Sequence, residues 1–404
     1  MKTHSPAVLE ADLLIAGGGL IGSTLALALA QLSADLRVLL LDRQPAPPPT
    51  DSRTAADRRV YALNAGSRQL LERLDAWKPL GAQAHAYRRM HIWDSAGSGV
   101  LDFSARQLGA AQLGHMVEAG AIQRILDARL AHTPNIQIRR PASVVGLEWR
   151  DSAACLRLAN GQQISTPLVC AADGAHSMLR QLAGIATRRE DCRQQAIVAS
   201  IRLDHPHQDC AWQIFHPTGP LAFLPLGDAG GRDCSIVWTL DNGEAERIAQ
   251  LADADFEHAL TRASETRFGR LTLRSPRQSF PLWQEHARRY VARNMVLVGD
   301  AAHRIHPLAG LGANLGLQDV RALVAELTRA QQRGIALNHP RILARYQRRR
   351  RLENATTMLA MRLFRHGFAH HSLAFNAIRN LGMTGLSRCK PLKIALARRA
   401  WMAD

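Results

Sequence analysis

Three glycines near the N-terminus have the spacing that a nucleotide phosphate requires. Gly17, Gly19 and Gly22 follow the apolar run 13–16 in G-x-G-x-x-G order, and Asp42 ends the next apolar run. In such a unit one glycine permits the tight turn, one lets a pyrophosphate approach, and one lets helix and strand pack closely, while the acid binds a ribose. The triplet alone could be a glycine-rich turn that binds nothing. Strand, helix and acid together predict dinucleotide binding.

Two further acids follow predicted buried strands. Asp173 comes directly after the run 168–172, and Asp300 follows the run 294–298. Parallel α/β sheets bind ligands beyond the carboxyl ends of their strands, so both acids are candidate ligand contacts. A loop with three glycines separates Asp300 from a predicted helix over 315–331. Its backbone N–H groups could lie against a ring system while Asp300 binds a polyol hydroxyl.

Hydrophobic periodicity predicts the elements that position these residues. Helices are expected over 25–32, 65–74, 119–131 and 253–268. A hairpin is expected within 87–103, a meander over 136–139, 143–149, 154–158 and 163–166, and a second sheet over 196–203, 211–217, 221–225 and 235–240. This order of elements predicts an α/β fold with a separate second sheet.

Composition excludes several classes of protein. The chain has 404 residues, 47% of them hydrophobic, which is typical of a soluble protein of two or three domains. Residues 1–11 are polar and show no signal peptide, and six scattered cysteines without a C-x-x-C pair predict reduced thiols in the cytosol. His303 and His306 stand beside Pro307 without an evident third ligand, so we predict no metal site.

Positive charge is concentrated at the C-terminal end. The formal net charge is +17, and residues 341–404 hold fourteen Lys or Arg against Glu353 and Asp404. One interpretation is a solvated, arginine-rich helical surface. The other is attraction to an anionic membrane face or an acidic partner. Nucleic acid is not predicted, because few aromatic residues are interleaved with the cations.

The three acid- and glycine-containing motifs occur in the order typical of one family. They resemble the FAD-dependent aromatic hydroxylases of the para-hydroxybenzoate hydroxylase type, and more narrowly the branch that acts in ubiquinone biosynthesis. The narrower resemblance is carried by Asp57-x-Arg59-x-x-Ala62-Leu63, Gln194-x-Ala196-Ile197-Val198, Phe215-x-Pro217-x-Gly219-Pro220, Phe280-Pro281-Leu282, Gly299-Asp300-Ala301-Ala302-His303, Tyr346-x-x-x-Arg350-x-x-x-Asn354 and Pro391-x-Lys393.

The resemblance implies a role for each candidate residue toward FAD. The ADP half would be held by Gly17, Gly19, Gly22, Asp42 and Arg43, and the pyrophosphate and ribityl chain by Arg59, Gln123, Asp173, Gly299 and Asp300. The isoalloxazine would be bordered by Pro307, Leu308, Gly310, Gly312, Ala313 and Asn314. No side chain is expected to act as a catalytic acid, base or nucleophile, because the flavin carries the chemistry.

The resemblance also implies a domain plan. A Rossmann-like FAD-binding domain would be assembled from three segments, with a substrate domain inserted as a hairpin and a sheet, and a basic helical region at the end. The FAD-binding segments are 1–80, 111–190 and 286–335; the substrate segments are 81–110 and 191–285; the C-terminal region is 336–404.

The implied reaction is oxygen insertion into an aromatic ring. NAD(P)H, which would bind without a Rossmann domain of its own, reduces the flavin; O₂ adds at the flavin C4a position, and the terminal oxygen of this hydroperoxyflavin attacks an electron-rich phenol. A polyprenylated phenol would need an apolar channel and access to a membrane surface or a biosynthetic complex, which the basic C-terminal region could provide. The protein is expected in the cytosol, with docking at the inner face of the membrane left open.

Four residues depart from those common in similar hydroxylases. Cys192, Ile214, Leu311 and Ala313 are expected near the ring or the substrate. They leave two alternatives open. One is a soluble hydroxylase of a small phenolic acid, and the other is a flavin-bearing subunit without catalytic activity in a biosynthetic complex.

Overall fold

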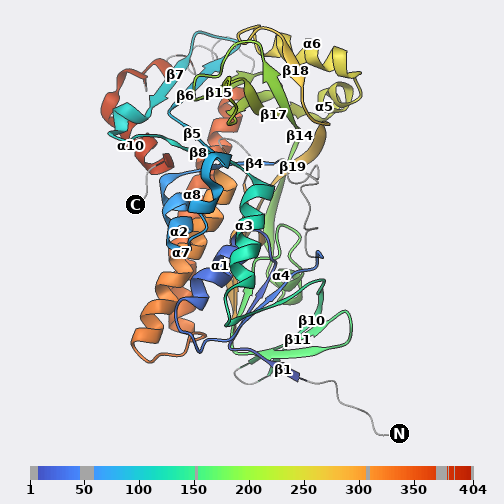
Figure 1. The fold of residues 1–404 in the computed structure, drawn as a ribbon, viewed down its shortest axis with the longest axis vertical. Coiled ribbons are helices and arrows are strands. Elements are labelled where there is room, and N and C mark those ends of the chain that lie inside the picture. Colours follow the sequence, from blue (N-terminus) through green and yellow to red (C-terminus); the bar gives the residue numbers. More distant parts are fainter. Residues whose placement is uncertain are drawn as a thin grey trace.

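A large sheet and a smaller one lie at opposite ends of the molecule, with a group of helices along one side between them (Figure 1). The computed structural model describes residues 8–45, 59–150, 153–305, 310–369, 380, 382–385 and 387–401. Strands β15 and β17 mark the sheet at the top of Figure 1, and β10 and β11 mark a smaller sheet at the bottom. The predicted residues Pro307 and Leu308 and the motif residue Asp57 lie outside the described part of the chain.

The glycine-rich unit forms the strand, helix and second strand that were predicted. These are β2 (Leu13–Ala16), α1 (Leu20–Ala30) and β3 (Val38–Leu41). Both strands are completely buried, as expected of a parallel sheet covered on two faces. Helix α1 begins earlier than the predicted residue 25, because the extended backbone of Gly19 (φ −74°, ψ −173°) caps it directly.

A six-stranded sheet is built around this unit. Its order is β20-β21-β13-β2-β3-β9, and all neighbours from β21 to β9 are parallel. The further strands are β9 (Ile136–Arg139), β13 (Val169–Ala171), β20 (Val291–Ala292) and β21 (Met295–Leu297). The prediction that 136–139 belongs to the meander was wrong. The segment precedes the meander strands closely in sequence, but its backbone pairs in parallel with β3 and extends the six-stranded sheet.

The rest of the predicted meander forms a four-stranded sheet with the N-terminal strand. Its order is β1-β12-β11-β10. The strands are β1 (Val8–Glu10), β10 (Val144–Arg150), β11 (Ala153–Leu158) and β12 (Gln163–Thr166). The turn at Asn160 and Gly161 joins β11 to β12, with Gly161 at φ +85°, the left-handed conformation that an Asn-Gly hairpin turn requires.

The second large sheet contains all four strands predicted for it. A nine-stranded sheet has the order β22-β19-β14-β17-β16-β15-β6-β7, with β18 paired to β14. Its strands are β6 (Arg89–Asp94), β7 (Val100–Ser104), β14 (Thr187–Leu203), β15 (Cys210–His216), β16 (Gly219–Pro225), β17 (Asp233–Asp241), β18 (Leu271–Leu273), β19 (Gln278–Ala287) and β22 (His303–Arg304). Because β14 and β19 are long, they carry the connection from this sheet toward the rest of the molecule (Figure 1).

Two helices cover the outer face of the nine-stranded sheet. They are α5 (Asn242–Ala249) and α6 (Asp253–Ala263), so the helix predicted over 253–268 is shorter than expected and α5 was missed. Phe256 of α6 packs in one buried cluster with Ile214 and Phe223 of the sheet. The opposite face of the sheet is therefore the one turned toward the remainder of the protein.

Short elements connect the two large sheets. The strands β4 (Val60–Leu63), β5 (Ala84–Tyr87) and β8 (Gly114–Glu118) form a three-stranded sheet in the order β4-β8-β5. The helices are α2 (Ala65–Arg73), α3 (Ala119–Ala131) and α4 (Met178–Leu182), with 3-10 turns η2 (Lys78–Gln83), η3 (Ala105–Leu108) and η4 (Gly299–Ala301). The predicted helices over 65–74 and 119–131 are confirmed.

The long helices of the described C-terminal part of the chain follow η4. They are α7 (Leu311–Gln332), α8 (Pro340–Ala369) and α10 (Lys390–Trp401). Helix α7 starts four residues before the predicted 315, since left-handed Gly310 (φ +62°) caps it and Gly312 continues the helix. Among the described residues, no helix combines the length and the apolar character needed to cross a bilayer.

Candidate functional site

The glycine-rich loop has no room for side chains at two positions and open space at a third. A Cβ on Gly17, whose φ is +104°, would lie 2.3 Å from the Ala172 carbonyl oxygen, and one on Gly22 would lie 1.8 Å from the Gly17 oxygen. A Cβ on Gly19 would meet no atom of the described residues within 4 Å, apart from its own chain neighbours. The loop is therefore packed closed behind Gly17 and Gly22 and open at the first turn of α1, where helix N–H groups lack partners.

Side chains from α3 and β3 border the same loop. Gln123 donates to the Gly18 carbonyl at 2.8 Å, which holds its amide against the loop. Asp42 ends β3 beside Gly18, since a Cβ on that glycine would lie 2.5 Å from Asp42 Oδ2. Asp42 also accepts the Gln44 N–H at 3.0 Å, and Arg43 beside it is exposed. The predicted ribose acid and the predicted phosphate loop are thus neighbours.

The second acid occupies the end of β13. Asp173 accepts the Leu179 N–H at 3.2 Å through Oδ2, while its buried Oδ1 has no partner among the described groups. Burial raises the pKa of Asp173, against the lowering effect of its hydrogen bonds with Ser177 and the backbone. An orphaned buried carboxylate oxygen at this edge of the sheet is what a bound polar group would satisfy.

The third acid follows β21 and lies near two arginines. Asp300 keeps accessible surface although protein groups surround its carboxylate, and burial raises its pKa while His303, Arg304 and Arg59 lower it. Burial raises the pKa of Tyr61 in β4, while the charge of Arg59 lowers that pKa and the charge of Asp300 raises it. The structure therefore brings Arg59 and Asp300, far apart in sequence, within electrostatic range of one another.

Buried Arg180 connects the segment after Asp173 (the second motif) to the segment after Asp300 (the third motif). Its guanidinium donates to the carbonyls of Ala175 and Ala301, each at 2.9 Å, and pairs with Glu285 at 3.1 Å. Sequence reasoning gave Arg180 no role. The sequence did contain a signal for Arg180, because an arginine in a helix that follows a buried strand must find carbonyl or carboxylate partners.

The start of α7 is fixed by an amide, not left free for a ligand. Asn314 is 3% exposed; its Nδ2 donates to the Ala62 carbonyl at 2.7 Å, and its Oδ1 accepts from Asn64 N at 2.9 Å and Ser67 Oγ at 2.7 Å. The side chain predicted to border a flavin ring is thus used to join α7 to β4 and α2. Backbone N–H groups remain the polar groups that the first turn offers.

A buried carboxylate behind the third motif connects it to α8. Asp319 of α7 is 0% exposed and accepts from Gly299 N at 2.9 Å, His303 Nε2 at 2.6 Å and Arg350 Nε at 2.6 Å. Burial alone would raise its pKa, but His303 and Arg350 lower the pKa to about 2. The sequence placed Asp319 between Leu317 and Val320 on an apolar stretch of helix, which is the pattern of a buried, partnered acid.

An apolar pocket extends from Gly310 to the inner face of the nine-stranded sheet. Its volume is about 120 Å³, and its walls include Met116, Leu224 and Trp401. Two buried polar side chains, Gln213 and Thr239, also line it. A cavity thus lies between the inner face of this sheet and the start of α7.

Two of the departures do not face this pocket. Ile214 is fully buried against α5 and α6, and the expectation that it lies near the substrate was wrong because side chains alternate across β15. Cys192 packs with Ala196 and Leu282 at an irregularity of β14. Leu311 and Ala313 lie in the first turn of α7, next to Gly310.

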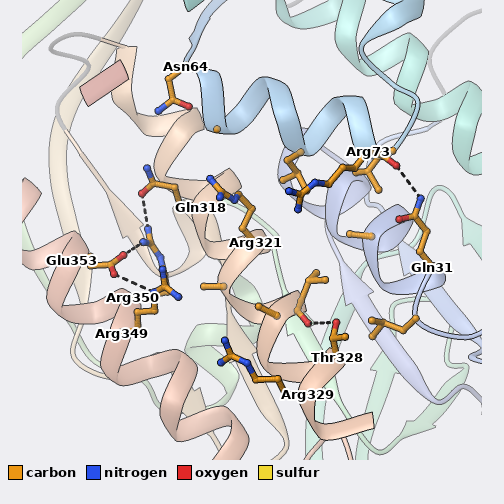
Figure 2. A pocket seen from close by; sticks show the side chains of 18 residues that line it. Gln31, Asn64, Arg73, Gln318, Arg321, Thr328, Arg329, Arg349, Arg350 and Glu353 are labelled. Carbon is orange, nitrogen blue, oxygen red and sulfur yellow. Dashed lines mark hydrogen bonds and ion pairs between the residues drawn. The ribbon is translucent and has the colours of Figure 1, made fainter. Parts of the chain in front are cut away.

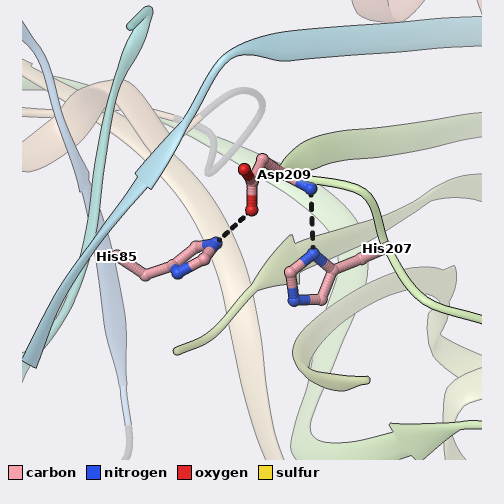
Figure 3. A group of neighbouring side chains, drawn as sticks. All are labelled: His85, His207 and Asp209. Atoms are coloured by element: carbon pink, nitrogen blue, oxygen red, sulfur yellow. Dashed lines mark hydrogen bonds and ion pairs between the residues drawn. The ribbon is translucent and has the colours of Figure 1, made fainter. Parts of the chain in front are cut away.

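The described residues contain a single trio with metal-type ligand atoms, His85, His207 and Asp209 (Figure 3). His207 Nδ1 accepts the Asp209 N–H at 3.1 Å, so Nε2 carries the proton that it donates to the Leu226 carbonyl at 3.1 Å. Neither nitrogen presents a free lone pair. His85 Nε2 lies 3.2 Å from Asp209 Oδ1. The contact of His85 with the Asp209 carboxylate joins β5 to the turn before β15, where the hydrogen bonds of His207 hold the chain.

Comparison with known proteins agrees with this geometry. A family model described as FAD binding domain matches residues 10–360. The 3-demethoxyubiquinol 3-hydroxylase of Escherichia coli (strain K12) is 36% identical over 383 residues, covering 95% of this chain and 96% of that protein. Ubiquinone hydroxylase UbiL of Rhodospirillum rubrum is 34% identical over 394 residues, covering 96% and 89%.

Solved structures share the fold at low sequence identity. p-Nitrophenol 4-monooxygenase PnpA from Pseudomonas putida DLL-E4 has a TM-score of 0.78 at 17% identity, covering 98% of this chain and 99% of that one. PqsL from Pseudomonas aeruginosa, a probable FAD-dependent monooxygenase, has a TM-score of 0.77 at 19% identity, covering 93% and 100%. The fold is that of the FAD-dependent monooxygenases. Within that class, the chain belongs to the FAD-binding-domain family that includes the ubiquinone hydroxylases.

Proposed function

We propose that the protein is an FAD-dependent monooxygenase that hydroxylates the aromatic ring of a polyprenylated phenol in ubiquinone biosynthesis, with O₂ and NAD(P)H as co-substrates. The observation that carries this proposal is the apolar pocket between Gly310 and the inner face of the nine-stranded sheet. A ring held there would lie beside the segment that the family resemblance assigns to the flavin ring. The full-length relatives named as hydroxylases of ubiquinone or demethoxyubiquinol support the same substrate class.

The residues around the glycine-rich loop fit FAD. We propose that Gly17, Gly19 and Gly22 admit the pyrophosphate to the first turn of α1, with Gln123 beside it and Asp42 on the adenosine ribose. The open space at Gly19 is the observation that supports a bound phosphate, and the orphaned Oδ1 of Asp173 supports a ligand hydroxyl that donates a hydrogen bond at this edge.

The protein's contribution to the reaction is placement and exclusion of water. Bound FAD would supply the oxygen-transfer chemistry. Met116, Leu224 and Trp401 would shield the reacting ring from solvent, which strengthens the polar contacts that remain. We propose that Gln213 or Thr239 binds the phenol oxygen, because their side chains supply the polar groups of an otherwise apolar wall.

Filling the pocket tests this assignment. Ala222→Phe, on the pocket-lining side of β16, is expected to lower hydroxylation of the quinone precursor at least tenfold in complemented cells, with FAD content unchanged. The matched control is Ile214→Val, which alters the opposite face of the sheet and should cost about 1 kcal/mol of stability with full complementation. Rapid NAD(P)H oxidation by the parent with a small phenolic acid, and normal quinones in the Ala222→Phe strain, would favour the soluble alternative.

We also propose that the C-terminal helices dock on an anionic membrane surface. Leu352, Leu359 and Leu363 of α8 are 68%, 52% and 65% exposed, and their spacing places them within about 40° on one helix face. Leu392 and Leu396 of α10 are 52% and 46% exposed. Exposed leucines next to a basic segment are typical of interfacial helices.

The same region reaches the substrate pocket. Trp401 of α10 lines the pocket, hydrogen-bonds with Tyr87 and contacts Phe103 of β7 with ring centroids 5.0 Å apart. Burial raises the pKa of Tyr87, so its hydroxyl stays protonated at that contact. A membrane beneath α10 would therefore place lipid next to one wall of the pocket, where a polyprenyl tail could leave the protein.

Vesicle flotation of the FAD-loaded protein tests the docking proposal. Leu392→Ser/Leu396→Ser is expected to lower binding to phosphatidylglycerol-containing vesicles at least fivefold, because apolar area no longer enters the interface. Val145→Ser/Leu182→Ser removes two exposed apolar side chains elsewhere and should bind as the parent does. Equal binding by both double variants and the parent would contradict membrane docking through α10.

A further inference from the structure

A second and larger cavity lies among the helices. It has a volume of about 660 Å³ and is bordered by α1, α2, α7 and α8 (Figure 2). Ala28 and Gln31 line it from the end of α1, so it lies about 15 Å along that helix from Gly19. The cavity is therefore separate from the phosphate loop at the other end of α1, and the proposed hydroxylation makes no use of it.

The lining of this cavity carries excess positive charge. Its charged side chains are Arg73, Arg321, Arg329, Arg349, Arg350 and Glu353. The lining's carboxylate, Glu353, already pairs with both Arg349 and Arg350. Arg329 pairs at 2.7 Å with Glu326, which also lies 3.5 Å from Arg345. Arginines in and around the cavity thus outnumber the carboxylates that they pair with, which leaves a net positive charge. A concave space concentrates the electric field of this positive charge.

The cavity has the features of a binding site and not only of a basic surface. Arg350 and Asn64 contribute to its wall although they are 2% and 4% exposed, so part of the lining is held rigidly. Figure 2 shows Arg73 of α2 and Arg321 of α7 extending toward the same space, with Gln318 on the adjacent wall. Planar guanidinium groups bind phosphate oxygens in pairs, and the volume lies in the range of small-ligand pockets.

We propose that this cavity binds a molecule carrying a phosphate group, with Arg73 and Arg321 as its principal cationic contacts. The phosphate belongs either to a free small molecule or to a lipid headgroup. Gln31 donates to the Arg73 carbonyl at 3.3 Å and Thr328 donates to the Val324 carbonyl at 2.8 Å, so their side-chain oxygens are the groups that can accept hydrogen bonds from the rest of the ligand.

The position of the cavity links it to the flavin-binding edge. Arg350 lines the cavity and donates to Asp319 at 2.6 Å, and Asp319 accepts the Gly299 N–H at 2.9 Å. On the other wall, Asn64 donates its N–H to Asn314 at the start of α7. A ligand that moves Arg350 would shift Asp319, which is hydrogen-bonded to Gly299 beside Asp300. A ligand that moves Asn64 would shift Asn314 at the start of α7.

Calorimetric titration of the FAD-loaded protein with inorganic pyrophosphate tests the proposal. We expect saturable binding that weakens at least tenfold in Arg73→Gln/Arg321→Gln, with FAD content unchanged because neither residue borders the glycine-rich loop. The control Arg157→Gln/Arg289→Gln changes two exposed arginines that do not line the cavity and removes the same charge. This variant should bind pyrophosphate within twofold of the parent.

A parallel titration with phosphatidylglycerol vesicles distinguishes the two sources of phosphate. Binding of pyrophosphate assigns a free ligand. Binding of vesicles alone, lost in Arg73→Gln/Arg321→Gln and kept in Arg157→Gln/Arg289→Gln, assigns a lipid headgroup. Three outcomes would overturn the proposal while leaving the hydroxylase assignment standing: equal weakening in both double variants, no saturable binding of either probe, or vesicle binding that Arg73→Gln/Arg321→Gln retains when pyrophosphate does not bind.

Discussion

Gly19→Val is expected to yield a folded protein that no longer retains FAD. Valine accepts the extended backbone of Gly19, and within the part of the chain that the structure describes its Cβ would meet no atom beyond its chain neighbours within 4 Å, so folding should be unaffected. That open space is where we place the pyrophosphate, and a branched side chain would exclude it. We expect FAD affinity to fall at least a hundredfold, about 2.7 kcal/mol or more, measured by fluorescence titration of the apoprotein.

Two companion variants make this result specific. Gly22→Ala should lower both the unfolding free energy and the FAD content, because its Cβ would lie 1.8 Å from the Gly17 oxygen. Gly243→Ala, in the first turn of α5 with no protein atom within 4 Å of its Cβ, should change neither. FAD binding by Gly19→Val at parental affinity would show that the phosphate lies elsewhere.

Asp319→Asn is expected to be among the most destabilising single changes in the chain. It leaves His303 and Arg350 buried without the carboxylate that both contact. Breaking a buried charge pair by removing one partner costs about 3–5 kcal/mol, which denaturant unfolding of the apoprotein measures. Asp233→Asn, at a pair with Arg202 that is exposed to solvent, should cost under about 1 kcal/mol.

The effect of Asp319→Asn should depend on pH in a defined direction. His303 and Arg350 hold the pKa of Asp319 at about 2, below the ordinary 3.8, so its carboxylate contributes full stability above the ordinary value. That contribution is lost as pH falls through 3.8 toward 2, because the unfolded chain then binds the proton more readily. The difference in unfolding free energy between parent and variant should therefore shrink on acidification. A constant difference would mean that Asp319 is not the charged hub described above.

The glycine-rich unit was predictable because short-range rules determine it. Apolar runs, glycine spacing and a following acid specify a strand, a turn and a helix within thirty residues, and β2, α1 and β3 have that form. The start of α7 was less predictable. Glycines at 310 and 312 suggested an open loop, whereas contacts of Asn314 with β4 and α2, distant in sequence, stabilise the helix from residue 311.

The residues behind the site escaped sequence reasoning for a similar reason. Arg180 and Asp319 belong to none of the motifs that carry the family resemblance, and Arg350, although it is part of the Tyr346–Asn354 motif, was given no partner. Only their burial shows that each must have a partner of opposite charge, and burial depends on the tertiary fold. The error over Ile214 has a local cause, since a shift of one residue along a strand exchanges the two faces of a sheet.

Profiling of quinones by mass spectrometry in a strain that lacks this gene tests the central claim most directly. The account predicts accumulation of a polyprenylated phenol that lacks one ring oxygen, and its structure would identify the carbon that is hydroxylated. Restoration of the quinone by the parent gene, but not by the Ala222→Phe gene, would connect that activity to the apolar pocket. An unchanged quinone pool in a strain without a second hydroxylase of the same type would contradict the proposed function.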